Sequence, residues 1–357
     1  MQIIFSKVGV IGAGAMGRGI AQMAAQAGSE VMLLDVQADA AEAAKKAIEG
    51  AWQKLEDKGR IAQGQARTWS AQLKVAGSLA DLASCQLVVE AVVEKLDLKR
   101  QLFGELEGIV ADDAILATNT SSLSVTAIAA SLRRPGRFAG YHFFNPVPLM
   151  KVVEVIAGLK TDPAVCRQLT AYARQFGHTP VAAQDTPGFI VNHAGRGYGT
   201  EALRTVSEKV ADFATIDRIL RDQMGFRLGP FELFDLTALD VSHPVMESIY
   251  HQYYEEARYR PSVITAQRLA GGIVGKKVGE GFYRYTDGKA EVPAEPPVPT
   301  VGSLPPVWVS PKAARRQALY QLLKQFGARI ETAQTPSEQA LILVAPLGMD
   351  VTTLAAV

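Results

Sequence analysis

A glycine-rich turn near the start of the chain constrains its fold more than any other feature. The turn reads Gly12-Ala13-Gly14-Ala15-Met16-Gly17, which is the Gly-x-Gly-x-x-Gly pattern. A β-branched run at 7–11 precedes it, a helix-forming stretch at 16–27 follows it, and a second apolar run at 31–34 comes next. This order of strand, glycine turn, helix and strand predicts the first βαβ unit of a doubly wound parallel sheet.

The same turn predicts a dinucleotide site, because its glycines allow a tight turn, a close approach to a pyrophosphate and close helix–strand packing. Asp35 follows the second strand, eighteen residues after Gly17. A carboxylate there accepts hydrogen bonds from the adenosine ribose hydroxyls and repels a 2′-phosphate, which favours NAD over NADP. The alternative is an ordinary glycine turn with an incidental surface aspartate. The predicted cofactor contacts are Gly12, Gly14, Ala15, Met16, Gly17 and Asp35.

Composition excludes several other classes of protein. The 37 basic side chains nearly cancel the 36 acidic ones, so the chain lacks the basic footprint of a nucleic-acid-binding protein. Cys85 and Cys166 lie far apart, and we expect neither a disulfide nor a metal site. The first residues do not resemble a signal peptide, and no apolar run reaches the ~18 residues of a membrane span. We expect a cytoplasmic protein that binds neither nucleic acid nor membranes.

Strand and helix patterns alternate as far as residue 185. The further strand patterns lie at 87–91, 115–118, 138–142 and 152–156, and the helical patterns around 95–108, 125–131 and 163–176. Such alternation predicts a mostly parallel sheet covered on both faces. The fold class is therefore α/β, a Rossmann-type doubly wound parallel sheet formed by residues 1–185.

The pattern becomes nearly all helical after residue 185. We predict an all-α C-terminal domain at 186–287, with breaks at Gly225, at Gly229-Pro230, near Pro244 and at Pro261. A Pro-rich linker at 288–306 and a small, incomplete α/β extension at 307–357 follow. This last segment is small for an independent core, and the sequence leaves open whether the natural chain continues past Val357.

His142 and Glu154 are the candidate reaction centre. His142 ends a predicted strand, at the edge of the sheet that carries ligands in such folds. Alcohol oxidation needs a base for the hydroxyl proton, and an imidazole suits that task. Glu154 interrupts an apolar strand pattern, and a carboxylate beside a histidine fixes the ring and stabilises the imidazolium. A satisfied core histidine and an edge-facing glutamate account for this spacing equally well.

The stretch HFFNPVPLMKVVEVI at 142–156 also resembles the signature of L-3-hydroxyacyl-CoA dehydrogenases. The resemblance covers residues 6–285. Its other blocks are GAGAMG at 12–17, VEAVVE at 89–94, NTSSLS at 119–124, DTPGFIVN at 185–192, GPFEL at 229–233 and GKKVGEGFY at 275–283. It implies a homodimer that binds NAD and an acyl-CoA, and that oxidises an L-3-hydroxyacyl-CoA to the 3-oxoacyl-CoA.

The resemblance also implies roles for single residues. His142 would be the base, Glu154 its orienting carboxylate, and Ser121 and Asn192 the hydrogen-bond partners of the substrate's reacting oxygens. The implied NAD contacts are Asp35, Glu94, Ser121, Asn145 and Lys277, and the implied coenzyme A contacts are Lys58 and Lys99. Several of these residues also suit plainer roles: Ser121 could cap the next helix, Asn192 could lie near a helix start, and the two lysines could be solvated surface charges.

Two positions depart from the family pattern. Residue 51 is Ala, where the family often has a serine facing coenzyme A, and Arg196 lies among three glycines where bulkier apolar residues are usual. A comparable arginine, and a segment like 255–262, occur in the 3-hydroxyadipyl-CoA dehydrogenases of phenylacetate breakdown, which this chain resembles most. Arg196 is therefore either a contact for a distal carboxylate of the substrate or an arginine exposed on a helix.

Two other functions remain open at this point. One is a dehydrogenase of small hydroxy acids or sugars, which would act without coenzyme A. The other is an NAD-binding protein without turnover, which could lose His142, Glu154, Ser121 or Asn192 freely.

Overall fold

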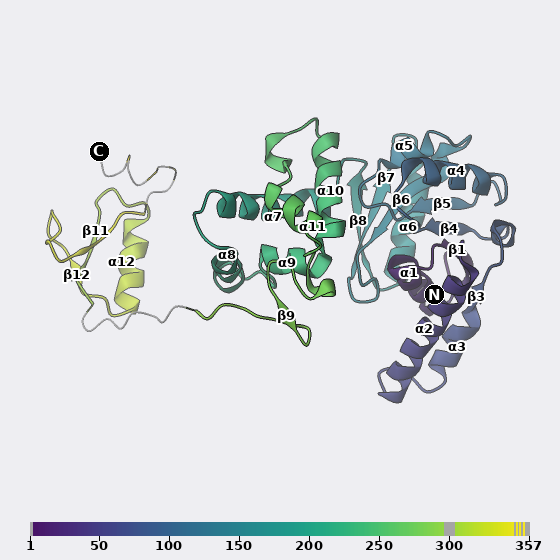
Figure 1. Cartoon of the computed structure of the whole chain (residues 1–357), viewed down its shortest axis with the longest axis horizontal. Coiled ribbons are helices and arrows are strands. Elements are labelled where there is room, and N and C mark those ends of the chain that lie inside the picture. Colours follow the sequence, from purple (N-terminus) through teal and green to yellow (C-terminus); the bar gives the residue numbers. More distant parts are fainter. Residues whose placement is uncertain (1–2, 296–303, 346–347, 349, 351–352, 354–357) are drawn as a thin grey trace. The chain divides into compact units, whose positions relative to one another are not determined.

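The computed structural model describes residues 3–295, 304–345, 348, 350 and 353, and the chain divides into two compact units, Met1–Val292 and Pro293–Val357. The first unit contains a sheet domain and a helical domain, and the second is a small α/β unit (Figure 1).

The sheet domain contains eight strands in the order β3-β2-β1-β4-β5-β6-β7-β8. The strands are β1 (Lys7–Ile11), β2 (Glu30–Leu34), β3 (Leu73–Val75), β4 (Leu87–Glu90), β5 (Ile115–Thr118), β6 (Phe138–Phe143), β7 (Val152–Ala157) and β8 (Thr179–Gln184). The helices are α1 (Ala15–Gln26), α2 (Ala38–Asp57), α3 (Gln65–Gln72), α4 (Leu96–Glu107), α5 (Val125–Ala129) and α6 (Pro163–Gln175). Because β2 and β3 extend from one side of β1 and β4 from the other, the chain reverses direction across the sheet between β1 and β4, where such folds bind ligands.

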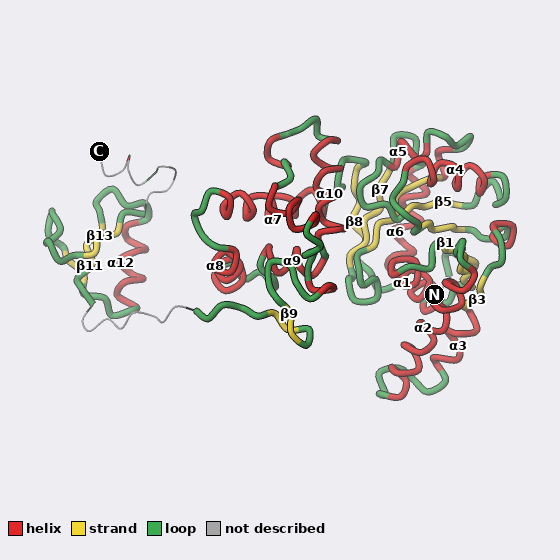
Figure 2. Tube along the Cα trace, viewed as in Figure 1, coloured by secondary structure: helices red, strands yellow, loops and turns green. Residues whose placement is uncertain are grey.

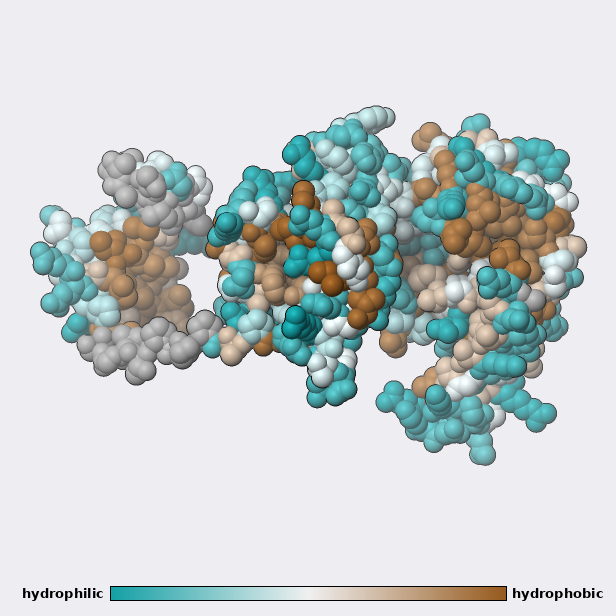
Figure 3. Space-filling model, in the orientation of Figure 1, coloured by the Kyte–Doolittle hydropathy of each residue, from teal (hydrophilic) through white to brown (hydrophobic). Residues whose placement is uncertain are grey.

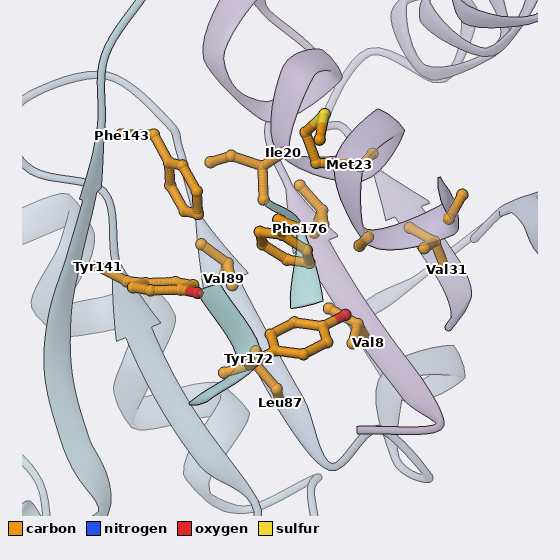
Figure 4. Close-up of a cluster of buried hydrophobic side chains, with 14 of the residues drawn as sticks. Val8, Ile20, Met23, Val31, Leu87, Val89, Tyr141, Phe143, Tyr172 and Phe176 are labelled. Atoms are coloured by element: carbon orange, nitrogen blue, oxygen red, sulfur yellow. The ribbon is translucent and has the colours of Figure 1, made fainter. Parts of the chain in front are cut away.

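Two hydrophobic cores lie on opposite faces of this sheet, because successive strand residues point to opposite sides. Val8 and Val10 of β1 join one core with side chains of α1, α2 and α6 (Figure 4). Ile11 of the same strand joins the other, with Phe103 of α4 and Ile128 of α5. The doubly covered, mainly parallel sheet predicted from the sequence is thus confirmed.

The sequence patterns missed one α-helix and two strands of this domain, and one feature of its topology. The missed elements are α3, β3 and β8. The direction of β7 also differs from a purely parallel sheet, since β6 and β7 pair antiparallel while the other neighbouring pairs of the sheet are parallel. The eight residues at 144–151 connect them, because antiparallel neighbours do not need the long crossover that parallel strands require.

The helical domain follows β8. It comprises α7 (Val191–Ser207), α8 (Phe213–Arg218) with a π-helical turn (Ile219–Gln223), α9 (Pro230–Thr237), α10 (Leu239–Gln252), α11 (Val263–Ala270) and the hairpin β9 (Tyr285–Thr286) and β10 (Lys289–Ala290). The break predicted near Pro244 is wrong, because α10 runs through this proline and the chain turns at Ala238, whose φ is +65°. Pro244 lies inside α10, where it removes one backbone hydrogen bond, but its fixed φ is compatible with the helix, which continues past it.

The second unit is a three-stranded parallel sheet with one helix (Figure 2). Its elements are β11 (Val307–Val309), α12 (Arg316–Gln325), β12 (Ile330–Glu331) and β13 (Leu341–Leu343). Their order is β12-β11-β13, as expected of a small α/β extension. The predicted linker at 288–306 overlaps β10 at its start, and its residues 296–303 lie outside the described part of the chain.

None of the helices that the structure describes combines the length and apolar character needed to cross a membrane. Among the described residues, no cluster of three or more His, Cys, Asp or Glu side chains is arranged to hold a metal ion. The cytoplasmic location stays a prediction.

Candidate active site

The three glycines of the turn between β1 and α1 meet three different steric demands. Gly12 has a φ of +99°, and a Cβ there would lie 2.5 Å from the carbonyl oxygen of Ala91. A Cβ on Gly17 would lie 1.7 Å from the carbonyl oxygen of Gly12, which no side chain can tolerate. A Cβ on Gly14 would meet nothing within 4 Å. The first and third glycines are required by the fold, and the second faces open space that a ligand can occupy.

The start of α1 suits an anion. Its N-cap, Gly14, makes no side-chain capping bond, and its first turn holds no acidic residue, so the helix dipole and N–H groups are available to a pyrophosphate. Asp35 lies beside the turn, since one carboxylate oxygen accepts a hydrogen bond from the Ala13 N–H at 2.7 Å and the other from the Gln37 N–H at 2.9 Å. These residues fit a dinucleotide whose ribose lies against Asp35.

The pairing of β6 with β7 brings His142 and Glu154 together. The two residues are direct partners in the antiparallel register, and Nδ1 of His142 lies 2.7 Å from Oε2 of Glu154. Glu154 is fully buried between β6 and β8, so the edge-facing alternative is wrong. The rings of Phe144 and Phe189 flank the imidazole, with centroids 4.5 and 5.8 Å away. The predicted contact is present.

Glu154 is held as a carboxylate. Burial opposes its ionisation, but the hydrogen bond with His142 and those from the Ile190 and Val191 N–H groups, at 2.8 and 2.9 Å, lower its pKa below the ordinary value. A carboxylate only accepts hydrogen bonds, so Nδ1 of His142 donates and Nε2 of the neutral ring is free to accept a proton. Glu154 therefore orients His142 and also anchors the start of α7.

The start of α7 also carries Asn192 toward Ser121. The Asn192 side-chain amide donates to the carbonyl oxygen of Ser121 at 3.4 Å. The alternative that Ser121 caps the next helix is wrong, because Ser124 is the N-cap of α5 and accepts from the Ala127 N–H at 3.1 Å. Asn192 lies in the first turn of α7, so the plainer expectation of a position near a helix start is confirmed. The predicted quartet thus lies around one junction of the sheet with α7.

Lys99 requires a correction. Its side chain is 1% exposed, and its ammonium lies 2.6 Å from Glu90 and 3.2 Å from Glu94. It is neither a solvated surface charge nor free to contact coenzyme A, because α4 directs it inward and two carboxylates neutralise it. Lys58 is exposed at the C-terminal end of α2, and its coenzyme A role stays a prediction.

The remaining predicted NAD contacts stay predictions as well. Lys277 is exposed and pairs with Asp240 of α10, and Asn145 is exposed just after β6. Glu94 accepts hydrogen bonds from the loop that carries Ser121, including one from the Ser121 N–H at 2.9 Å.

Sequence reasoning missed two residues that support the site. The side-chain oxygen of Asn119 accepts a hydrogen bond from the Phe143 N–H at 2.9 Å, which holds the strand end beside His142. The carboxylate of Asp185 accepts from the Val125 and Thr126 N–H groups at 2.8 and 2.6 Å. The signal for Asn119 was its place directly after a buried strand, where polar residues of such sheets gather.

Comparison with known proteins places this architecture in one family of dehydrogenases. The family model described as "3-hydroxyacyl-CoA dehydrogenase, NAD binding domain" matches residues 7–186, and the model of the C-terminal domain of the same family matches residues 188–285. The chain belongs to the 3-hydroxyacyl-CoA dehydrogenase family, and its sheet domain is the NAD-binding domain of that family.

Relatives of this chain include 3-hydroxyadipyl-CoA and 3-hydroxybutyryl-CoA dehydrogenases. The chain is 43% identical over 290 residues to a 3-hydroxyadipyl-CoA dehydrogenase of Escherichia coli, a match that covers 80% of this chain but only 60% of the longer relative. It is 42% identical to a probable 3-hydroxybutyryl-CoA dehydrogenase of Deinococcus radiodurans, over 78% of this chain and the whole relative. A crystal structure of a 3-hydroxybutyryl-CoA dehydrogenase from Escherichia coli aligns with a TM-score of 0.80 and 40% identity, over 84% of this chain and 62% of that one.

Proposed function

We propose that this chain oxidises L-3-hydroxyacyl-CoA to 3-oxoacyl-CoA with NAD. The observation that carries the proposal is the buried His142–Glu154 pair, which lies on the sheet that also carries the dinucleotide turn at 12–17. The relatives' names support the same reaction. The test is the formation of NADH from a 3-hydroxyacyl-CoA by the purified protein.

In the proposed mechanism, Nε2 of His142 accepts the proton of the substrate's 3-hydroxyl. Glu154 keeps the proton of the ring on Nδ1 and stabilises the imidazolium as it forms. The Ser121 hydroxyl and the Asn192 amide hold the reacting oxygen, which orients the C3–H bond. NAD, when bound, supplies the acceptor for the hydride. The flanking rings of Phe144 and Phe189 exclude water from the imidazole.

The surroundings of Arg196 favour a substrate whose acyl chain ends in a carboxylate. It lies four residues after Asn192, so both side chains project from one face of α7, separated by ~6 Å along the axis. Its Nε is buried without a hydrogen-bond partner among the described residues, and burial lowers the pKa of Arg196 to about 10. A simply exposed arginine would show neither feature. An anion at this position would pair with the guanidinium and offset its desolvation.

The length of the substrate's acyl chain favours an adipyl group. Three carbon–carbon bonds separate C3 from the distal carboxylate carbon of a six-carbon diacid, a span of roughly 4 Å. The step from Asn192 to Arg196 is ~6 Å along the helix, and helical side chains lean toward the N-terminus, so the guanidinium can reach back to a carboxylate at this shorter distance. An arginine-lined pocket of about 650 Å³, which includes Arg204, lies farther along α7. Arg204 is ~18 Å from Asn192 along the helix, beyond the reach of such a substrate.

Replacing Arg196 is expected to change specificity. Arg196→Leu should lower kcat/KM for 3-hydroxyadipyl-CoA by about 30- to 100-fold, because a charge-assisted hydrogen bond of ~2–3 kcal/mol is lost. Activity on 3-hydroxybutyryl-CoA should stay within about twofold. Arg204→Leu, on the same helix, is the matched control and should leave the ratio of the two activities unchanged. Equal losses on both substrates would contradict the assignment.

We also propose that the helical domain forms a homodimer. Large apolar side chains of the segment 219–236 are exposed, and hydrophobic residues are visible on this domain in Figure 3. They are Ile219, Met224, Phe226, Leu228, Leu233 and Leu236. Exposed apolar clusters of this kind mark association surfaces. Sedimentation equilibrium should give about twice the 38.3 kDa chain mass, and Phe226→Glu should shift it to the monomer; a wild-type monomer at micromolar concentration would contradict the proposal.

A further inference from the structure

Three charged side chains near the end of β4 form a triad, Glu90–Lys99–Glu94, in which Glu90 and Lys99 are buried and the Glu94 side chain is 34% exposed. Glu90 is fully buried in the strand end, and Lys99 is 1% exposed on α4. The Lys99 ammonium bridges the two carboxylates, at 2.6 Å from Glu90 and 3.2 Å from Glu94. Buried charges are costly unless they are paired and hydrogen-bonded. The two carboxylates therefore fix the position of the Lys99 ammonium.

Each end of the triad is tied to a different part of the site. Glu90 is the register partner of Ile11, which directly precedes the glycine turn, and its carboxylate accepts hydrogen bonds from the Thr118 hydroxyl at 2.6 Å and the Val92 N–H at 2.7 Å. Glu90 thus lies where the order of the strands reverses, at the edge that faces the dinucleotide turn.

Glu94 holds the loop that follows β5. One of its oxygens accepts from the Thr120 hydroxyl at 2.6 Å, the Ser121 N–H at 2.9 Å and the Ser122 N–H at 3.1 Å. Burial opposes the ionisation of Glu94, but the charge of Lys99 and the hydrogen bonds from Thr120 and Ser121 lower its pKa. Glu94 therefore remains an anion that can accept all these bonds at once.

We propose that the Glu90–Lys99–Glu94 triad is a positioning device that fixes Ser121 for the reaction. Lys99 holds Glu94 in place, Glu94 holds the backbone at Ser121, and Ser121 holds the reacting oxygen. The inference rests on the proposed function, in which the Ser121 hydroxyl contacts the substrate. Lys99 then affects turnover through Glu94 and Ser121.

A double-mutant cycle tests this coupling. Lys99→Met and Ser121→Ala are each expected to lower kcat/KM by about 100-fold, since small displacements of a positioned group have effects of that size. The double variant should fall no more than about twofold below Ser121→Ala, because residues that act through one another are not additive. Lys74→Met, which removes the exposed ion pair with Glu30, is the matched control and should retain full activity.

Additive losses in the cycle would overturn the proposal, because they would mean that Lys99 acts independently of Ser121. A Ser121→Ala variant with full activity would overturn it as well. The proposed function fails on a different result: turnover that survives the loss of His142.

A milder pair of variants serves if Lys99→Met does not fold. Thr118→Val keeps the volume but removes the hydrogen bond to Glu90 and the acceptor of the Thr120 N–H, and Thr118→Ser restores both. Hydrogen exchange of the amides at 121–124, which lie beyond the Thr120 N–H that Thr118 itself accepts from, should be about tenfold faster in Thr118→Val, with kcat lowered and the KM for NAD little changed. Thr118→Ser should recover the exchange rates and kcat. Unchanged exchange in Thr118→Val would overturn the proposal, since the loop would then be independent of the triad.

Discussion

His142→Gln is expected to lower kcat by about 10³-fold, a loss of ~4 kcal/mol of transition-state stabilisation. Glutamine approximates the shape of the ring but cannot accept the hydroxyl proton. The dissociation constant for NAD should stay within about twofold, because the glycine turn and Asp35 do not contact His142. Stopped-flow or steady-state NADH absorbance gives kcat, and fluorescence titration gives the NAD affinity.

A histidine outside the site provides the control for this experiment. His251 is exposed and pairs with Glu255, so His251→Gln should keep wild-type turnover. If His142→Gln retained more than about a tenth of the wild-type kcat, His142 would not be the base.

Glu154→Gln should lower kcat by about 10²- to 10³-fold, although the change is nearly isosteric. If its amide oxygen accepts from Ile190 and Val191, its NH₂ group faces Nδ1 of His142 and forces the ring into the tautomer with the proton on Nε2. If the amide is reversed, its NH₂ group opposes two N–H donors. Steady-state kcat over pH 6–9 measures the effect, and a kcat equal to that of the wild type would contradict the orienting role.

The same variant has a signature in stability. The pKa of Glu154 is lower in the folded chain than its ordinary value of 4.5, so the ionised carboxylate stabilises the fold above about pH 4.5. This contribution is lost as the pH falls below that value through the folded pKa. The free energy of unfolding of the wild type should therefore exceed that of Glu154→Gln at pH 7, by an amount that stays constant down to about pH 4.5 and shrinks below that pH. A difference that does not change with pH would contradict a buried carboxylate.

The sequence predicted the start of the sheet well, because the glycine turn and its flanking runs allow only one local arrangement. Gly17 illustrates why: any side chain there would collide with the carbonyl oxygen of Gly12. The spacing of His142 and Glu154 was equally compatible with two residues that never meet. What joins them is the antiparallel register of β6 and β7, and periodicity alone does not reveal strand direction.

Lys99 shows where single-sequence reasoning fails. A lysine on an amphipathic helix is usually solvated, and the family resemblance suggested a ligand contact. The available signal was Glu90, an acidic residue directly after Val88 and Val89 in a strand pattern. A buried carboxylate requires a partner, and Lys99 meets that need only because α4 folds back over the end of β4.

The most direct test of the proposed reaction is the turnover of L-3-hydroxybutyryl-CoA and L-3-hydroxyadipyl-CoA with NAD, followed as NADH absorbance with the full chain. We predict NADH formation matched by an equal amount of 3-oxoacyl-CoA, and no NADPH formation when NADP replaces NAD. A protein that binds NAD in titration but forms no NADH with either substrate would contradict the account.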